Sequence, residues 1–136
     1  MSTISHQTAL VYTMVIVSAA DRNMTDSEIL TIGEIVRTLP VFRDYDRDLL
    51  PTAAADCAAM LGQDEGLEAV LGLIQEALPE RLRETAYALA CDVAAADESL
   101  GQEELRLLEI IRHRLDINRL HAAAIEKGAA ARYAHA

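Results

Sequence analysis

Apolar residues recur at intervals of three and four along most of the chain, a spacing typical of helices that bury one face. Turn residues divide this pattern into about seven segments. The predicted helices cover approximately residues 4–20, 25–39, 44–61, 67–78, 79–96, 102–115 and 117 onward. The third segment is either one helix with a proline in its first turn or two short helices divided by that proline.

Individual residues mark where several of these helices begin and end. Pro40 ends the second helix, and Pro79 suits the first position of the fifth. The last helix is expected to fray from Gly128 into an alanine-rich tail. Two helices carry matching apolar stripes, which we expect to face the core: Ile29, Ile32, Val36 and Leu39 in one, and Leu105, Leu108, Ile111 and Leu115 in the other.

One stretch of sequence occurs twice, 76 residues apart. Residues 17–39 align with residues 93–115, and each copy reads Ala-Ala-Asp followed by a Glu seven residues after the Asp. A repeat kept only for packing would preserve the apolar stripe and let the acids vary. Here the acids of the two copies are retained: Asp21 and Glu28, and Asp97 and Glu104. The repeat predicts two helix-loop-helix units related by a pseudo-twofold axis, with their loops facing each other.

Composition supports an all-α fold in a single domain. Alanine and leucine, both strong helix formers, are abundant, and aromatic residues make up only 4% of the chain. The 136 residues are enough for one hydrophobic core. We expect one domain over residues 1–136, made of a first repeat (about 8–39), linking helices (about 44–78), a second repeat (about 79–115) and a C-terminal helix with its tail (117–136).

Charge and hydropathy narrow the possible partners and location. The formal net charge of −10 argues against nucleic acid as a partner and suits cations or a basic protein. The longest uncharged apolar run, residues 9–20, is too short to span a membrane, so direct membrane insertion is not expected. The first residues lack the features of a secretory signal, and a cytoplasmic location follows as the default. Cys57 and Cys91 lack metal-ligand spacing and are expected to be buried thiols.

The repeated acids have both structural and functional interpretations. Glu28 falls where a helix-capping glutamate would sit, opposite Thr25, whereas Gly101 has no side chain to complete such a box with Glu104. Each repeated Asp closes a helix at the negative end of its dipole, where a carboxylate is unfavourable. Because an Asp occupies this unfavourable position in both copies of the repeat, we expect a divalent cation to neutralise its charge.

The type of ion follows from the ligands. The chain offers carboxylates without paired Cys or His, which favours Ca²⁺, Mg²⁺ or Mn²⁺. We expect Asp21, Glu28, Asp97 and Glu104 to be its ligands or to support them. An EF-hand is excluded, because Asp26 stands where that loop requires Gly and Ile32 where it requires Glu.

Other sites leave weaker signals. A di-iron bundle is not expected because no Glu-x-x-His pair is present, and Glu109 with His113 is expected to form an exposed helical pair. No nucleophile motif or phosphate-binding glycine loop occurs, so catalysis is not expected, although hydrolysis by a metal-activated water stays open. Asp92 interrupts an apolar run; it serves either in helix pairing or in support of the metal.

The doubled Ala-Ala-Asp-x6-Glu motif, in an all-helical domain, resembles that of the tellurite resistance protein TerB and the wider TerB-like family. The resemblance covers roughly residues 8–118 and includes Leu-Pro-Glu-Arg at 78–81. Arg22 and Glu98 stand where family members usually have Gly. The resemblance implies a compact helical bundle, an acidic cluster that binds divalent metal, and a role in stress or metal resistance with protein partners, some of them membrane-associated.

Two hypotheses of different classes follow. The first is a non-enzymatic, divalent-metal-binding helical domain of TerB-like type. The alternative is an acidic interaction module that binds a basic partner without any metal.

Overall fold

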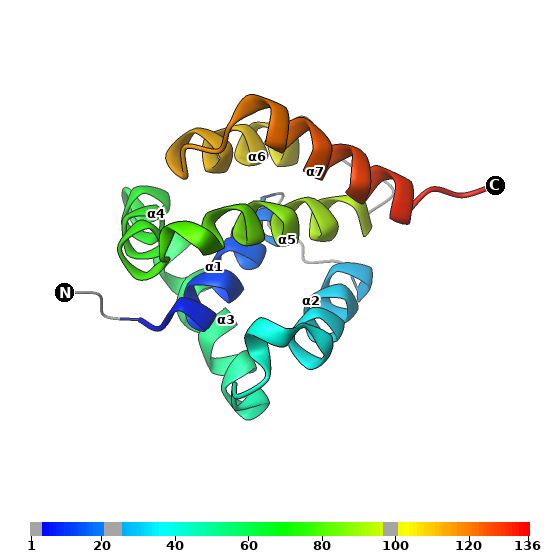
Figure 1. The fold of residues 1–136 in the computed structure, drawn as a ribbon. Helices are drawn as coiled ribbons and strands as arrows, with labels where there is room; N and C mark the ends of the chain where they lie inside the picture. The colour runs from blue at the N-terminus through cyan, green and yellow to red at the C-terminus, as the bar shows by residue number, and fades with distance from the viewer. Residues whose placement is uncertain (1–3, 21–25, 97–100) are drawn as a thin grey trace.

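The protein is a bundle of α-helices. The structure, a computed structural model, describes residues 4–20, 26–96 and 101–136, and within these ranges it contains helices and no strand (Figure 1). The helices are α1 (His6–Ser18), α2 (Asp26–Thr38), α3 (Leu50–Leu61), α4 (Gly66–Ala77), α5 (Arg83–Ala96), α6 (Gln102–Arg114) and α7 (Arg119–Arg132), with short 3-10 turns at Pro40–Phe42, Arg47–Leu49 and Glu80–Leu82. The predicted all-α class is therefore confirmed.

Helix α1 lies at the centre of the bundle and is apolar on all sides. Every residue from Ala9 to Ser18 is buried, and α1 packs against α3, α4 and α5. Its two buried hydroxyl groups bond within the helix: Thr13 donates to the carbonyl of Ala9 at 2.8 Å, and Ser18 to that of Met14 at 3.1 Å. A helix that is hydrophobic all round requires neighbours on every side, and here the rest of the chain supplies them.

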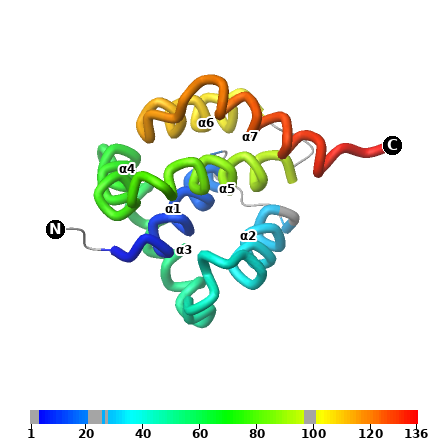
Figure 2. Tube along the Cα trace, in the orientation of Figure 1, coloured from blue at the N-terminus to red at the C-terminus, as the bar shows by residue number. Residues whose placement is uncertain are grey.

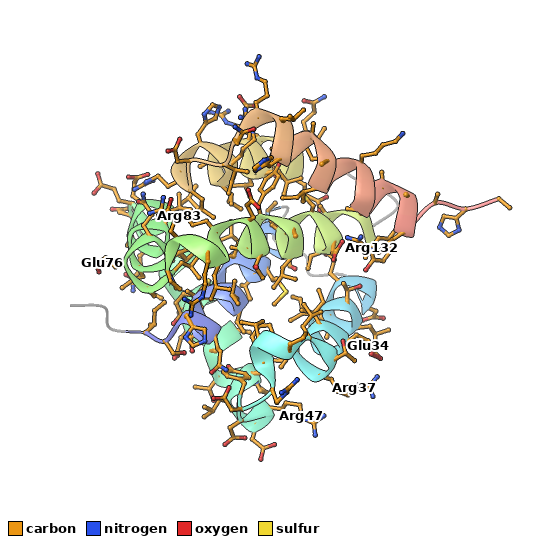
Figure 3. The ribbon with its side chains drawn as sticks, viewed as in Figure 1. Glu34, Arg37, Arg47, Glu76, Arg83 and Arg132 are labelled. Carbon is orange, nitrogen blue, oxygen red and sulfur yellow. The ribbon has the colours of Figure 1, made fainter. Side chains whose placement is uncertain are left out.

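Helix α5 is the second central element, and α7 runs alongside it in the same direction. Both point toward the side on which the C-terminus lies (Figure 2). Three side-chain hydrogen bonds connect the two helices along their length. They join Glu84 to His121, Tyr87 to Glu126 and Asp92 to Arg132. Arg132 lies at the end of α7 (Figure 3). Asp92 therefore serves in helix pairing, the first of its two predicted roles.

Several predicted helix boundaries are corrected by local chain geometry. Pro51 lies in the first turn of α3, which begins at Leu50, and a separate 3-10 turn precedes it. Pro79 adopts an extended conformation before a 3-10 turn, so it does not open α5 itself. Helix α7 continues through Gly128 to Arg132, where fraying was expected, because Ala129 packs into the core at 2% exposure.

The helix boundaries follow the 76-residue offset seen in the sequence. Moving the limits of α2 by 76 positions gives those of α6, since 26–38 becomes 102–114. The segments that join α1 to α2 and α5 to α6 lie partly outside the described residues. The pseudo-twofold relation between the two units thus stays a prediction, while the matching helix lengths agree with it.

The length and the apolar character of a helix decide whether it could cross a membrane. Within the described ranges, none of the helices combines the length and the apolar character that crossing a bilayer requires.

Candidate functional site

Two of the four predicted ligand carboxylates lie in the described part of the chain. Glu28 and Glu104 are each the third residue of their helix, α2 and α6 respectively. Both residues are buried, at 1% and 3% exposure. Asp21 and Asp97 lie outside the described residues. The structure therefore places half of the predicted set, at equivalent positions of the two repeats.

The burial of the two glutamates follows from the helical register. In α2, Ile32, Ile35 and Leu39 follow Glu28 by four, seven and eleven residues, so they share one face with it. Ile32 and Ile35 are 5% and 8% exposed, and Leu39 packs against the same core. The glutamate thus occupies the first position of an inward-facing stripe, where an apolar residue is the usual choice.

The same register corrects the predicted apolar stripes. Ile29 was expected to face the core but is 50% exposed, and its repeat counterpart Leu105 is 48% exposed. Each of them follows the buried glutamate by one residue, about 100° around the helix, and so turns toward solvent. In both repeats the true stripe begins with the acid and not with the neighbouring aliphatic residue.

Helix capping explains part of the position of Glu104. Its Oε1 accepts a hydrogen bond from the backbone N–H of Gly101, at 3.3 Å. The reciprocal bond of a capping box cannot form, because Gly101 has no side chain, as the sequence indicated. The proposed cap of α2, Thr25, lies outside the described residues. Capping satisfies one backbone group and does not by itself require the burial of Glu104, which is almost fully covered.

The helix dipole and burial act in opposite directions on the two glutamates. Each lies in the first turn of a helix, where the positive end of the helix dipole stabilises an anion, by about 0.3 to 1 kcal/mol. Removing an ionised carboxylate from water costs several kcal/mol, so the dipole alone does not offset the burial of either group. Chemically, a buried carboxylate at a helix N-terminus is suited to accept hydrogen bonds or to bind a cation.

No complete ligand set is formed by the described residues alone. Among residues 4–20, 26–96 and 101–136, no three His, Cys, Asp or Glu side chains gather around a point that could hold one ion. The predicted site draws half of its ligands from outside those ranges. Glu109 and His113 form the expected exposed pair on α6, with Oε1 and Nε2 4.0 Å apart.

Both cysteines are buried thiols, as predicted. Cys57 is fully covered and its thiol donates to the carbonyl of Tyr12, at 3.8 Å between sulfur and oxygen. Burial raises the pKa of Cys57 and of Cys91 to about 12. Both therefore stay protonated near neutral pH, a state poorly suited to nucleophilic attack or metal ligation.

Sequence reasoning missed some contacts that the structure supplies. The partner of Asp92 is Arg132, forty residues away on α7, and Arg114 of α6 binds Glu68 of α4 through two hydrogen bonds of 2.8 and 3.0 Å. Neither pair has a local sequence signal, since the partners meet only through the packing of separate helices. For the burial of Glu28 and Glu104 a signal exists: the spacing of four, seven and eleven to the apolar residues that follow.

Comparison with known proteins places the chain in a family. The model of the family described as "Tellurite resistance protein TerB" matches residues 7–127. No curated protein and no solved structure matches the chain. Along the described part of the chain, the family match runs from the second residue of α1 into α7, and it contains both copies of the repeated motif. The chain therefore belongs to the tellurite resistance protein TerB family.

Proposed function

We propose that this protein is a non-enzymatic domain that binds a divalent cation through Asp21, Glu28, Asp97 and Glu104. The observation that carries the proposal is the burial of Glu28 and Glu104 at equivalent places in the two repeats. A carboxylate in a core position costs several kcal/mol, and keeping one in both copies indicates a shared use. Binding a cation is the use that fits two anionic groups.

The chemistry of the four side chains favours a hard cation. Carboxylate oxygens are the preferred ligands of Ca²⁺, Mg²⁺ and Mn²⁺. In this proposal, the repeated aspartates supply oxygens from the segments before α2 and α6, and the buried glutamates supply or orient oxygens from the helices. The family of the chain supports a role in a cytoplasmic stress or metal-resistance response, with protein partners that include membrane-associated ones.

Titration of the purified protein with Ca²⁺, Mg²⁺ and Mn²⁺ tests metal binding directly. Calorimetry should detect heat from at least one ion, and an ion at 100 times its Kd should stabilise the fold by about 2.7 kcal/mol. Glu28→Gln combined with Glu104→Gln should abolish both effects. Glu103→Gln is the matched control, because Glu103 precedes Glu104 on the same helix and is exposed. Absence of heat and of thermal stabilisation with all three ions would refute the proposal.

The acidic interaction module is the second candidate, and the net charge of −10 favours it. It predicts that Asp21→Asn combined with Asp97→Asn raises the melting temperature by relieving repulsion, with or without Ca²⁺, Mg²⁺ or Mn²⁺. The metal-binding proposal predicts the opposite at a saturating concentration of the bound ion, where the variant melts below the unchanged protein. Melting curves with and without the three ions therefore separate the two candidates.

A further inference from the structure

A groove lies between α6 and α7, over the face of α5. Both helices pack on α5, but they make few contacts with each other. The space between them is a partly open cavity of about 490 Å³, lined by all three helices. This volume lies within the range of about 300 to 1,000 Å³ that small-molecule sites typically have. Of the two repeated carboxylates that the structure describes, Glu28 and Glu104, neither lines the groove.

The polarity of the groove changes along its length. Helices α6 and α7 form an antiparallel hairpin, so Arg112 near the end of α6 and Arg119 at the start of α7 lie at the turn. At the other end the lining is formed by Leu105 and by alanines, among them Ala95 and Ala130. From Arg119 to Ala130 the helix rises by about 16 Å. The groove therefore has a cationic end and an elongated apolar end.

The acids that line the groove lie beside a hydroxyl group and an imidazole, whereas no carboxylate pairs with its arginines within the described residues. Glu126 accepts a hydrogen bond from the Tyr87 hydroxyl at 2.5 Å, and Glu109 lies beside His113. In the part of the chain that the structure describes, neither Arg112 nor Arg119 has a carboxylate within salt-bridge distance. Nη2 of Arg112 lies 3.1 Å from Nε2 of the His113 ring, a contact with an imidazole and not with a carboxylate, so both guanidinium charges can attract an anion.

We propose that this groove binds a free, long-chain aliphatic carboxylate, with its head group at Arg112 and Arg119 and its chain along the alanines toward Leu105. The half-exposed Leu105 and the apolar lining gain from burial against an alkyl chain. A partner helix, about 10 to 12 Å in diameter with its side chains, is too large for a cavity of this size. An extended peptide would bring backbone N–H and C=O groups against alanine methyl groups that cannot bond them.

Dodecanoate, kept below its micelle concentration, is the probe. NMR titration should give saturable one-to-one binding, with shifts at the methyl groups of Ala94 and Leu108 in the groove and none at Ala53 on α3. Dodecanol, which lacks the charge, should bind about threefold to fivefold more weakly, the range of an exposed ion pair. Octanoate, with its shorter chain, should bind at least about tenfold more weakly.

Two pairs of variants locate the site. Ala123→Phe should weaken dodecanoate binding at least about tenfold by filling the groove, whereas Ala124→Phe should leave it unchanged. The neighbours Ala123 and Ala124 are both exposed on α7, and only Ala123 lines the cavity, so folding should tolerate both changes. Arg119→Gln should weaken binding about threefold to fivefold. Arg106→Gln, on α6 outside the groove, should have no effect.

Three results would overturn the proposal. They are absence of saturable dodecanoate binding, equal binding by the Ala123→Phe and Ala124→Phe variants, and equal affinity for dodecanoate and dodecanol. Adsorption to phosphatidylglycerol vesicles without binding of the monomeric carboxylate would likewise exclude a free ligand and favour a lipid surface.

Discussion

Two isoleucines of α2 provide a direct test of the corrected core stripe. Ile32 is 5% exposed and shares a face with the buried Glu28, whereas Ile29, three residues earlier, is 50% exposed. Replacing each by alanine removes the same atoms from the same helix. The two variants therefore differ only in how much of the removed side chain was in contact with the core.

The expected losses follow from these exposures. A buried Ile→Ala change costs about 2 to 5 kcal/mol, because the transfer free energy of the removed groups is lost and a cavity remains. For Ile32 we expect a loss of about 3 kcal/mol. For Ile29, half of the apolar area is already in water and no cavity forms, so the transfer loss is about 1 kcal/mol. Because alanine has a higher helix propensity than isoleucine, the net loss of stability is smaller than this transfer loss.

Urea denaturation followed by circular dichroism measures both free energies of unfolding. The same losses can be expressed as shifts of Tm in thermal melting. The unfolding entropy typical of proteins, scaled to 136 residues, is about 0.29 kcal/mol/K, so a loss of about 3 kcal/mol in Ile32→Ala should lower Tm by about 10 °C. The Ile29→Ala variant should lower Tm by about 3 °C or less. Equal losses, or a larger loss for Ile29→Ala, would show that the inward face of α2 is not the one that begins with Glu28.

Three further predictions concern individual side-chain contacts. Asp92→Asn should cost about 1 kcal/mol in urea denaturation by weakening the contact between α5 and Arg132, and an unchanged midpoint would contradict that role. The guanidinium of Arg114 holds the pKa of Glu68 below its ordinary value of 4.5, so this pair stabilises the fold above about pH 4.5 and its contribution is lost as the pH falls through the lowered pKa. In acid titrations, the Arg114→Gln variant should therefore lose less stability between pH 5 and pH 3 than the unchanged protein. The same loss in both proteins would refute this. Because burial raises the pKa of both thiols to about 12, an aromatic disulfide reagent at pH 8 should react with them only after denaturant is added, and fast reaction of the folded protein would be inconsistent with their burial.

The sequence was sufficient to predict the fold class and most of the helices. Helical spacing identified the central apolar helix and the matching helices of the repeat, because these signals are local and repeat every turn. Proline positions located helix ends to within a few residues. The 3-10 turns before α3 and α5 were missed, since their geometry depends on how the following helix meets its neighbours.

The candidate site was less predictable than the fold. The repeat identified Glu28 and Glu104 as a matched pair, but their burial was not predicted, because they were interpreted as helix-capping or metal-binding acids. The aliphatic neighbours Ile29 and Leu105 were placed inward because they continue the apolar stripes by helical spacing. A residue-by-residue comparison of spacing would have shown that the glutamates, and not these neighbours, are in phase with Ile32 and Leu108. Long-range pairs such as Asp92 with Arg132 have no such local signal.

The central position of α1 has a consequence for how the protein is made. Its ten consecutive buried residues precede the helices that cover them, and α5, which makes the most extensive contact with α1, ends only at Ala96. At about 5 to 20 residues per second, the ribosome needs about 4 to 16 s to add the intervening 78 residues. Helices α3 and α4 are added during that interval, but the face of α1 that packs against α5 stays uncovered until its end. The nascent chain is therefore a natural client for a chaperone that binds hydrophobic peptides, until α5 is complete.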